Sequence, residues 1–528
     1  MRPRSCYGVT LSAMFLRLSA AGLGLGVLAA APLLLAQAPA PKKDVAKVWA
    51  DVCASCHGPN MEGAQAPTML DDVWVSGTGD DAALAAVIKD GRIATGMPAF
   101  GGLLSDEDIR AMVVYIRETA GKARTAGANY AAPAANVTVE SEKHAFKLET
   151  FVEGVTAPWG VDFLPDGRML ITEKGGALRI ASATGVLVPE PVQGVPAVWS
   201  KGQGGLLDVA VHPDYARNGW IYISYSDPGE NDSAMTAVIR ARLKGNALAD
   251  VQQLFKAPAA TYRTGNVHFG SRFVFDGKGH VFFSIGERGQ GTDAQDLTRP
   301  NGKVHRINED GTIPADNPFV GRADAIQSIW SYGHRNPQGL AQQPGTGVLY
   351  DVEHGPRGGD ELNLVEKGKN YGWPVITYGM NYNGTPMTDK TAAPGMEQPV
   401  TYWVPSLAVA SIDFYNGTKF PAWKGNLFLG SLAAQELRRL ELGPTGVKQE
   451  VLFKNVGRLR DLIAGPDGAI YIAFNQPDRI ARIVPATAPS YLAAVESAYG
   501  YRDAAVVVGE PFRQWVIEDR FAGRTPPW

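Results

Sequence analysis

The sequence predicts an all-β six-bladed propeller that follows a small all-α domain. A turn leading into a short apolar strand occurs six times over residues 164–473, as expected for a propeller. The chain of 528 residues contains 60 Gly and 36 Pro, above the usual share of roughly 12%, which favours an architecture with many tight turns. Before this region, apolar residues recur at helical spacing, which predicts the all-α domain.

The composition excludes some classes of protein. Hydrophobic residues make up 45% of the chain and charged residues 20%, which is typical of a globular protein with a core. The 50 basic residues are balanced by 53 acidic ones, giving a net charge of −3 at pH 7. Because there is no basic surplus to neutralise phosphates, nucleic-acid binding is not expected.

The N-terminus has the pattern of a secretory signal peptide. Arg2, Arg4 and Arg17 precede an apolar stretch from Leu18 to Ala36, and Ala36-Gln37-Ala38 is a small-residue site that a signal peptidase can cleave. The apolar stretch is also close to the length that spans a bilayer, so an uncleaved membrane anchor is the alternative. We assign residues 1–38 to a signal peptide and expect a membrane association only if this segment is not cleaved.

Cys53-Ala54-Ser55-Cys56-His57 is the C-x-x-C-H pattern of covalent c-type haem attachment. A thioredoxin-like redox pair or half of a zinc site are the alternatives. Apolar residues between Val45 and Val52 precede the motif at helical spacing, whereas a thioredoxin motif follows a strand, and no further zinc ligands lie nearby. We therefore expect Cys53 and Cys56 to bind haem covalently, with His57 as an axial ligand of the iron.

The sixth ligand of the iron is predicted from the loop Thr95 to Phe100. Met97 lies there between Gly96 and Pro98, and a thioether on such a loop can approach the distal face of a haem. The following segment, Asp106 to Thr119, is predicted to be a helix with Ser105 as its N-cap. The apolar residues that share one face of this helix are Ile109, Met112, Val113 and Ile116.

On the C-x-x-C-H motif and the downstream Gly-Met-Pro, the segment from about Lys42 to Ala123 resembles a class I cytochrome c. The resemblance implies an all-α cytochrome c domain at residues 39–123 that carries one covalent haem c. It also implies maturation outside the bacterial cytoplasm, where this haem is attached. Together with the signal peptide, it predicts a periplasmic protein.

A linker and a repeated β unit follow. Ala, Gly, Pro and Asn dominate from Thr125 to Val137, so residues 124–143 are assigned to a linker. The six turn–strand units of the propeller, assigned to residues 144–486, are Leu164–Thr172, His212–Ile223, Asp276–Phe283, Gly345–Tyr350, Trp423–Leu429 and Gly465–Ala473. A pair of β-sandwiches is the alternative, but it would not explain why the first and last units are near copies.

Polar residues gather in the loops between the predicted strands. Propellers bind ligands at the mouth of the central channel, where such loops converge. The clusters are Gly202–Gly205, Asn266–Arg272, Gly333–Gly339, Gly355–Glu361 with Tyr371–Pro374, and Gly457–Asp461. Arg and His side chains from different repeats would meet there, which suits a multiply charged anion.

At these clusters, the region from about Leu148 to Pro485 resembles the soluble quinoprotein sugar dehydrogenases, which use pyrroloquinoline quinone (PQQ). The most specific segments are Gly-His-Arg-Asn-Pro-Gln-Gly-Leu at 333–340 and Asn-Tyr-Gly-Trp-Pro at 370–374. The resemblance implies a six-bladed propeller with PQQ in the channel mouth and calcium beside it.

The resemblance also implies roles for single residues. It makes His268 the general base and Gln203 a contact of the quinone. The residues implied to bind PQQ in addition are Arg335, Asn336, Gln338, Tyr382, Arg458 and Arg460, with Tyr382 as the weaker match. The backbone carbonyls of Gly355 and Pro356 match ligands of the calcium that binds PQQ, while Glu361 and the carbonyl of Tyr371 match a second, structural calcium. Oxygen ligands of this kind suit Ca²⁺ rather than a transition metal.

The expected function is a periplasmic quinohaemoprotein that oxidises an aldose or related sugar at PQQ and passes electrons to its haem. Its partners would be a small sugar and a downstream electron acceptor such as a cytochrome, an oxidase or a quinone.

The chain departs from the family pattern at one place. The glucose-specific branch has a Lys after a Ser-Leu pair, where this chain reads Gly430-Ser431-Leu432-Ala433. One cation for PQQ is therefore missing, and the identity of the substrate stays open. The alternatives are a dehydrogenase of a sorbosone-type aldehyde or a polyol, and a non-catalytic ligand-binding propeller. Residues 487–528 form an extension without an assigned role.

Overall fold

The structure is a computed structural model that describes residues 41–71, 73–75, 77–126, 133, 137–444 and 446–486. The predicted signal peptide at 1–38 and the C-terminal extension at 487–528 lie outside these residues, and so do residues 127–132 and 134–136 of the predicted linker. Within the described part of the chain, no helix combines the length and the apolar character needed to cross a membrane.

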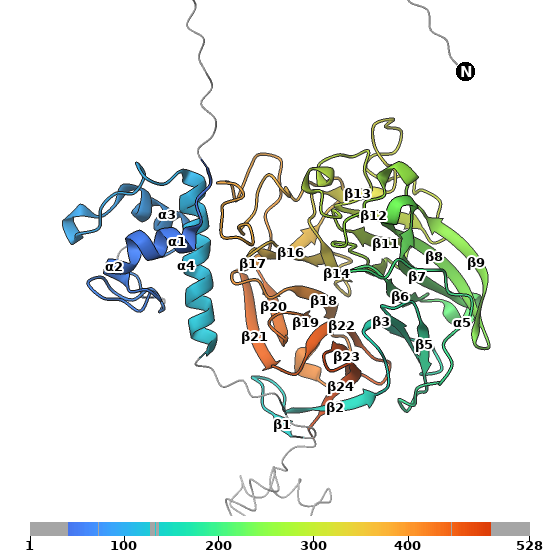
Figure 1. Cartoon of the computed structure of the whole chain (residues 1–528). Helices are drawn as coiled ribbons and strands as arrows, with labels where there is room; N and C mark the ends of the chain where they lie inside the picture. The colour runs from blue at the N-terminus through green and yellow to red at the C-terminus, as the bar shows by residue number, and fades with distance from the viewer. Residues whose placement is uncertain are drawn as a thin grey trace, which may run out of the picture. The chain divides into compact units, whose positions relative to one another are not determined.

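The N-terminal region is helical, as predicted. Its elements are α1 (Val45–Val48), the π-helical turn η1 (Trp49–Cys53), α2 (Ala54–His57), α3 (Asp81–Asp90), the 3₁₀ turn η2 (Ile93–Thr95) and α4 (Asp106–Ala126) (Figure 1). The Asp44 carboxylate caps α1 by accepting hydrogen bonds from the Ala46 and Lys47 amides, and Asp80 caps α3 in the same way from Ala83. The helices enclose a small core that contains Trp49, Leu84 and Ile88.

Helix α4 shows how local sequence sets an element. Ser105 and Asp108 form a reciprocal cap, because the Asp108 amide donates to Ser105 Oγ at 3.1 Å and the Ser105 amide donates to the Asp108 carboxylate at 3.1 Å. The predicted apolar face is buried, with Val113 fully enclosed. The helix continues to Ala126, past the predicted end at Thr119, because Ala120 keeps the apolar period and remains buried.

The strands that follow the helical region form six antiparallel sheets, which are the blades of a propeller (Figure 1). The first three blades contain β3 (Pro158–Phe163), β4 (Met169–Glu173) and β5 (Leu178–Ala181); β6 (Leu206–Val211), β7 (Trp220–Pro228), β8 (Ala234–Lys244) and β9 (Ala247–Phe255); and β10 (Phe273–Phe275), β11 (His280–Ile285), β12 (Lys303–Asn308) and β13 (Ile329–Tyr332). The fourth and fifth contain β14 (Pro337–Gln342), β15 (Leu349–Glu353), β16 (Asp360–Val365) and β17 (Thr401–Trp403); and β18 (Val409–Phe414), β19 (Leu427–Ser431), β20 (Glu436–Gly443) and β21 (Gly446–Lys454).

The sixth blade closes the ring with strands from both ends of the region. It contains β22 (Arg458–Ala464), β23 (Ile470–Asn475) and β24 (Arg479–Pro485), and β24 pairs antiparallel with β2 (Phe146–Val152), which is followed outward by β1 (Thr138–Val139). The first strands of neighbouring blades contact one another in the order β3, β6, β10, β14, β18, β22 and back to β3. Two elements, the end of α4 and β1, lie inside the predicted linker 124–143.

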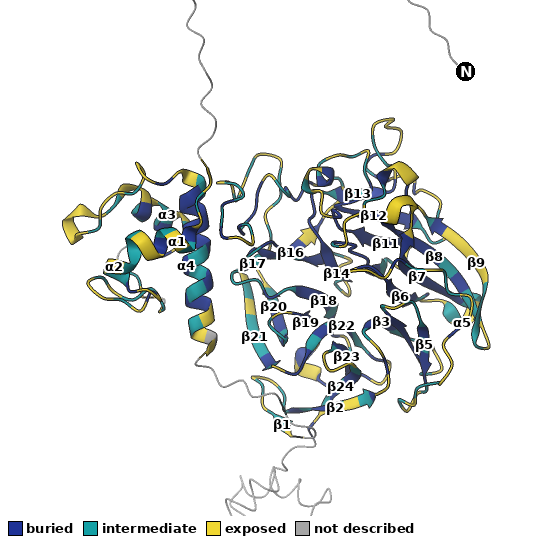
Figure 2. Cartoon of the chain, viewed as in Figure 1, coloured by how far each residue is buried: buried dark blue, intermediate teal, exposed yellow. Residues whose placement is uncertain are grey.

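Each of the six predicted turn–strand units contains the first residues of the second strand of one blade, and these strands are β4, β7, β11, β15, β19 and β23. The six-bladed propeller is therefore confirmed. In the first and last units, Gly167 and Gly468 have φ values of 86° and 80°, so these turns require a residue without a side chain. Figure 2 shows the inner strands buried, whereas the outermost strand β9 is largely exposed.

Candidate active site

Loops from several blades meet at one end of the central ring of strands. They precede the first strands β6, β10, β14 and β22, and they follow the second strands β11 and β15. Because the first and second strands of a blade are antiparallel, these two kinds of loop lie at the same end of the sheet. This geometry gathers the predicted site residues from loops that are far apart in the sequence.

His268 lies in the loop before β10 with an unusual backbone. Its φ is 56°, in the left-handed region that side chains rarely adopt, and the residue is buried. Its amide donates a hydrogen bond of 2.7 Å to Oε1 of Gln203, which comes from the loop before β6. Gln203 thus supports His268 directly, while its predicted contact with the quinone stays a prediction.

Glu287, directly after β11, was missed in the sequence and is a partner of His268. Its Oε1 bonds to His268 Nδ1, and the carboxylate is almost fully buried. A carboxylate at this nitrogen holds the proton of the neutral ring on Nδ1 and leaves Nε2 as the basic atom. Burial lowers the pKa of His268, as do the charges of Arg335 and Arg288, while Glu287 raises it. The signal available in the sequence was a polar residue immediately after an apolar strand.

Arg335, at the start of the fourth blade, is buried and oriented by several contacts. Its Nη1 donates to the carbonyl of His354 at 3.0 Å, and its Nη2 lies 3.4 Å from the hydroxyl of Tyr382. The guanidinium also lies 5.2 Å from the ring centroid of Trp373. Tyr382 itself is 72% exposed, so it marks the outer edge of the site.

The amides next to Arg335 continue the site across the channel. Asn336 Oδ1 accepts hydrogen bonds from the Gly270 amide at 3.1 Å and from Gln338 Nε2 at 3.3 Å. Gln338 Oε1 in turn accepts a hydrogen bond of 2.9 Å from Arg460 on β22. Asn336, Gln338 and Arg460 therefore form one chain of contacts that links the third, fourth and sixth blades.

The three predicted arginines have no carboxylate partner among the described residues, and the charge of Asp461 offsets that of Arg460 only in part. Neither Arg335, Arg458 nor Arg460 forms an ion pair with a carboxylate of the described chain. Burial, together with the charges of Arg458 and Arg272, lowers the pKa of Arg460 to about 9. Arg335 is buried and Arg458 and Arg460 are half-buried, and cations withdrawn from water are stable only when they are paired, so this arrangement favours an anionic ligand. Arg272, from one of the predicted loop clusters, differs because it pairs with Asp208 and Asp461.

His354 is a second residue that sequence reasoning missed. Burial and the positive charges of Arg335 and Arg460 hold its pKa well below the usual range, so its imidazole is neutral. It precedes Gly355 and Pro356, whose carbonyls are predicted calcium ligands. His354 therefore contributes a neutral polar side chain to a site that is rich in cations.

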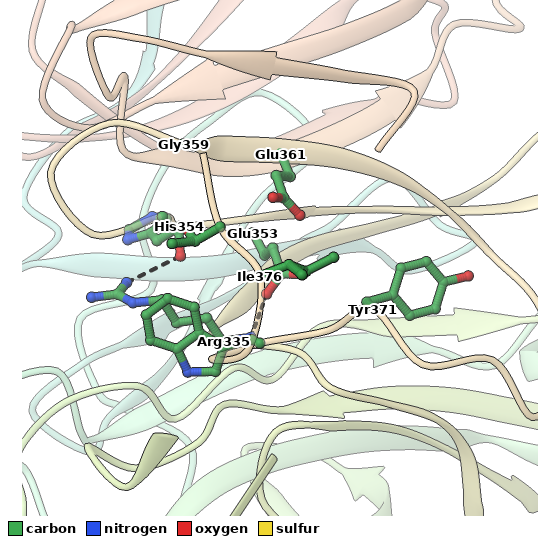
Figure 3. A pocket seen from close by; sticks show the side chains of 10 residues that line it. Arg335, Glu353, His354, Gly359, Glu361, Tyr371 and Ile376 are labelled. Atoms are coloured by element: carbon green, nitrogen blue, oxygen red, sulfur yellow. Dashed lines mark hydrogen bonds between the residues drawn. The ribbon is translucent and has the colours of Figure 1, made fainter. Parts of the chain in front are cut away.

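A pocket beside Arg335 gathers the other predicted metal ligands. It is lined by Gly355, Glu361 and Tyr371 together with Glu353 (Figure 3), whereas Pro356 is not among the lining residues. Burial and the negative charge of Glu353 raise the pKa of Glu361 well above its ordinary range. A divalent cation would relieve this excess of buried negative charge, and oxygen ligands of this type fit Ca²⁺.

Three buried residues at this pocket were not predicted, namely Glu353, which lines it, and His334 and Asp351, which do not. His334 Nδ1 lies 3.2 Å from the carboxylate of Asp351 and 3.3 Å from that of Glu353. These two carboxylates raise the pKa of His334 to about 9 against the opposing effect of burial. Glu353 Oε2 also accepts hydrogen bonds from the backbone amides of Arg335 and Asn336. The cluster therefore supports the loop that precedes β14 in the fourth blade.

The residues of the C-x-x-C-H motif fit a haem. Cys53 and Cys56 are free thiols, and burial raises the pKa of Cys53 to about 11. Burial also lowers the pKa of His57, which keeps the imidazole neutral and able to bind a metal. Met97 follows a left-handed Gly96 and packs on the same hydrophobic cluster as Cys53. The two thiols, the imidazole and the thioether are the set that c-type haem requires.

Comparisons with known proteins agree with both parts of the chain. Residues 155–482 match the family described as Glucose / Sorbosone dehydrogenase, and residues 40–116 match Cytochrome C oxidase, cbb3-type, subunit III. The chain is 44% identical to aldose sugar dehydrogenase YliI of Escherichia coli over 332 residues, which is 62% of this chain and 89% of the relative.

Solved structures support the same fold. The apo form of the soluble aldose sugar dehydrogenase of Escherichia coli is 40% identical, with a TM-score of 0.61, over 64% of this chain and 99% of that one. The PQQ-bound form of an aldose sugar dehydrogenase from Streptomyces coelicolor is 26% identical, with a TM-score of 0.53, over 64% of this chain and 98% of that one.

Proposed function

This chain belongs to the glucose/sorbosone dehydrogenase family and has an N-terminal cytochrome c domain, and we propose that it oxidises an aldose or related sugar with PQQ and passes the electrons to its own haem c. The family and the relatives named as sugar dehydrogenases support the enzyme class. The choice of sugar and the electron route go beyond these similarities.

The observation that carries the proposal is a set of arginines, one buried and two half-buried, that have no carboxylate partner among the described residues. PQQ carries three carboxylates, and guanidinium groups bind carboxylates through two parallel hydrogen bonds. Two blades supply Arg335, Arg458 and Arg460. Together these side chains would bind an anion from more than one side. The amides of Asn336 and Gln338 would complete its hydrogen bonds, and Tyr382 would lie at its rim.

His268 is the proposed general base. When bound, PQQ supplies an electrophilic quinone that accepts a hydride from the sugar carbon. His268 Nε2 takes the proton of the hydroxyl group on that carbon, so the C–H bond gives up a hydride, the O–H bond gives up a proton, and the C–O bond becomes a carbonyl. Glu287 stabilises the imidazolium that this transfer creates, and burial keeps the ring neutral beforehand.

Two calcium sites are part of the proposal. The carbonyls of Gly355 and Pro356 would hold the Ca²⁺ that binds PQQ, and Glu361 with the Tyr371 carbonyl would hold a second one. Calcium at the first site would act as a Lewis acid beside the quinone. The buried carboxylates around Glu361 support a cation at the second site.

The haem of Cys53, Cys56, His57 and Met97 would receive the electrons and deliver them to a cytochrome, an oxidase or a quinone. A periplasmic location is part of the proposal, because the signal pattern at 1–38 and the haem attachment motif both call for export. A sorbosone-type aldehyde or a polyol is the second substrate class, because the absence of a lysine at Gly430–Ala433 leaves the substrate open. A binding protein without turnover is disfavoured by the paired His268 and Glu287.

A substrate screen tests the proposal. The full chain, carrying haem and loaded with PQQ and Ca²⁺, is mixed with aldoses, aldehydes and polyols while the haem absorbance is followed. Haem reduction by a sugar, only when both PQQ and Ca²⁺ are present, is the expected result. Reduction of PQQ-free protein by sugar with a nicotinamide, or no reduction by any substrate, would contradict it.

A further inference from the structure

Arg288 is a buried arginine that bonds to peptide carbonyls and, like Arg335, has no carboxylate partner among the described residues. It follows Glu287 directly, its side chain is fully enclosed, and its φ is 60°. Arg272 and Arg439, which are also buried, each pair with carboxylates. Arg288 forms no ion pair with any described residue, and burial lowers its pKa to about 9.

The donors of Arg288 are directed at peptide carbonyls of the loop that carries His268. Nη1 donates to the carbonyl of Val267, and Nη2 donates to that of Gly265 at 2.6 Å. Longer contacts of 3.4 Å reach the carbonyls of Arg263 and Ala234. The planar guanidinium also lies 3.4 Å from the ring centroid of Phe269, so it contacts the residues on both sides of His268.

The backbone that these contacts hold is strained. His268 and Ser271 have φ values of 56° and 87°, and such conformations persist only when the surroundings hold them. On the C-terminal side, the amides of Gly270 and Ser271 bond to Asn336 Oδ1 and Ser284 Oγ. On the N-terminal side, Arg288 binds the two carbonyls at 265 and 267.

We propose that Arg288 is a positioning residue for the general base: it fixes the backbone of His268 through the carbonyls of Gly265 and Val267, while the adjacent Glu287 fixes the imidazole ring. The proposal rests on the proposed role of His268. Because the two supports are consecutive residues at the end of β11, one strand end sets both the position and the tautomer of the base.

Three variants of the full-length holoprotein test this role. Arg288→Met removes the charge and the donors at similar volume, and Arg288→Lys keeps the charge but cannot span both carbonyls with a planar fork. Arg306→Lys is the matched control, because Arg306 is buried in the same sheet, lies 5.0 Å from the Trp330 ring and pairs with Asp316 away from the site.

The first readout is hydrogen–deuterium exchange of the protein without substrate. Faster exchange of the amides at 266–271 is expected in both Arg288 variants, with the rest of the propeller unchanged and with the control like the wild type. The second readout is turnover. A fall of kcat of about 10–100-fold is expected for Arg288→Met, of the size that a small misplacement of a catalytic group causes, with the affinity for PQQ unchanged.

The third readout separates positioning from simple stabilisation. His268 faces the charges of Glu287, Arg335 and Arg288 and the neutral His354. Loss of the Arg288 charge should therefore move the acidic limb of the pH–rate profile to higher pH in Arg288→Met but not in Arg288→Lys. Exchange and turnover like the wild type in both variants, or a general loss of folding or of PQQ binding without a change at 266–271, would overturn the proposal.

The failure of this inference is distinguishable from failure of the proposed function. If His268→Gln abolishes turnover while both Arg288 variants remain fully active, only the role of Arg288 is wrong. If His268→Gln oxidises sugar at the normal rate, the proposed base is wrong, whatever the exchange data show.

Discussion

At the scale of single residues, the candidate site combines a neutral base with unpaired cations. Burial keeps His268 neutral, and Glu287 orients its ring. Arg335 and Arg460 have no carboxylate partner among the described residues, so their charge is available to a ligand. The same surroundings therefore favour both proton abstraction and anion binding.

Replacing His268 with Gln should lower kcat by about 10²–10⁴-fold, the range for loss of a general base. Binding of PQQ should survive, because Arg335 and Arg460 are untouched. Stopped-flow haem reduction measures the rate, and titration with PQQ measures the affinity. An equal loss of PQQ affinity would show that His268 holds the cofactor instead of acting on the substrate.

The pH dependence follows from the lowered pKa of His268. The base works when it is neutral, so kcat/KM should be full at neutral pH and fall only as the pH drops through a pKa below the ordinary value of about 6.5. Glu287 raises this pKa, so Glu287→Gln should move the acidic limb to still lower pH and reduce the maximal rate. A limb that moves upward in this variant would contradict the assigned pair.

At the scale of elements, strand ends position the site. The bulge between Leu459 and Asp461 on β22 lies at Arg460, where the strand leaves regular pairing with β23. Arg460 reaches Gln338 of the neighbouring β14 loop from this point. The irregular end of a strand, not its regular part, therefore supplies the cation.

Replacing Arg460 with Gln should weaken PQQ binding by about 10–100-fold, as expected when a charge-assisted hydrogen bond of about 1.5–3 kcal/mol is lost. The rate at saturating PQQ should change less than the affinity. Isothermal titration of the Ca²⁺-loaded protein provides the measurement, with Arg306→Lys as the control. An unchanged affinity of the Arg460→Gln variant for PQQ would mean that Arg460 affects only the charge of the channel and does not bind PQQ.

At the scale of the whole molecule, one chain joins a dehydrogenase domain to a cytochrome c domain. Sugar oxidation releases two electrons together, whereas a haem accepts one at a time. Covalent linkage of the two domains would give the proposed haem an effective concentration of about millimolar, as for other short linkers. Transfer within one chain should therefore be faster than transfer between chains.

Sugar should reduce the attached haem at a rate that does not depend on protein concentration. A variant with Cys53→Ser and Cys56→Ser should still reduce a small artificial dye but fail to reduce the natural acceptor. Stopped-flow traces at several protein concentrations measure this. A rate that rises in proportion to concentration would show that electrons travel between molecules.

The sequence by itself determined the features that short segments encode. The six turn–strand units predicted the second strand of every blade, because a glycine turn and an apolar strand are local signals. The C-x-x-C-H motif and the Ser105 cap are likewise complete within a few residues. The roles of His268 and the arginines came from resemblance to a family and remain predictions.

Only the tertiary structure decided which polar loop residues meet. It placed Glu287 on His268, Arg288 on the carbonyls beside it, and His334 between Asp351 and Glu353. Glu287 and Arg288 carry no periodic or motif signal, and although His334 lies in the segment 333–340, nothing local in the sequence names its carboxylate partners. Their partners are set by the pairing register of the strands and by the packing of neighbouring blades, and burial then gives each contact its effect on charge and proton affinity.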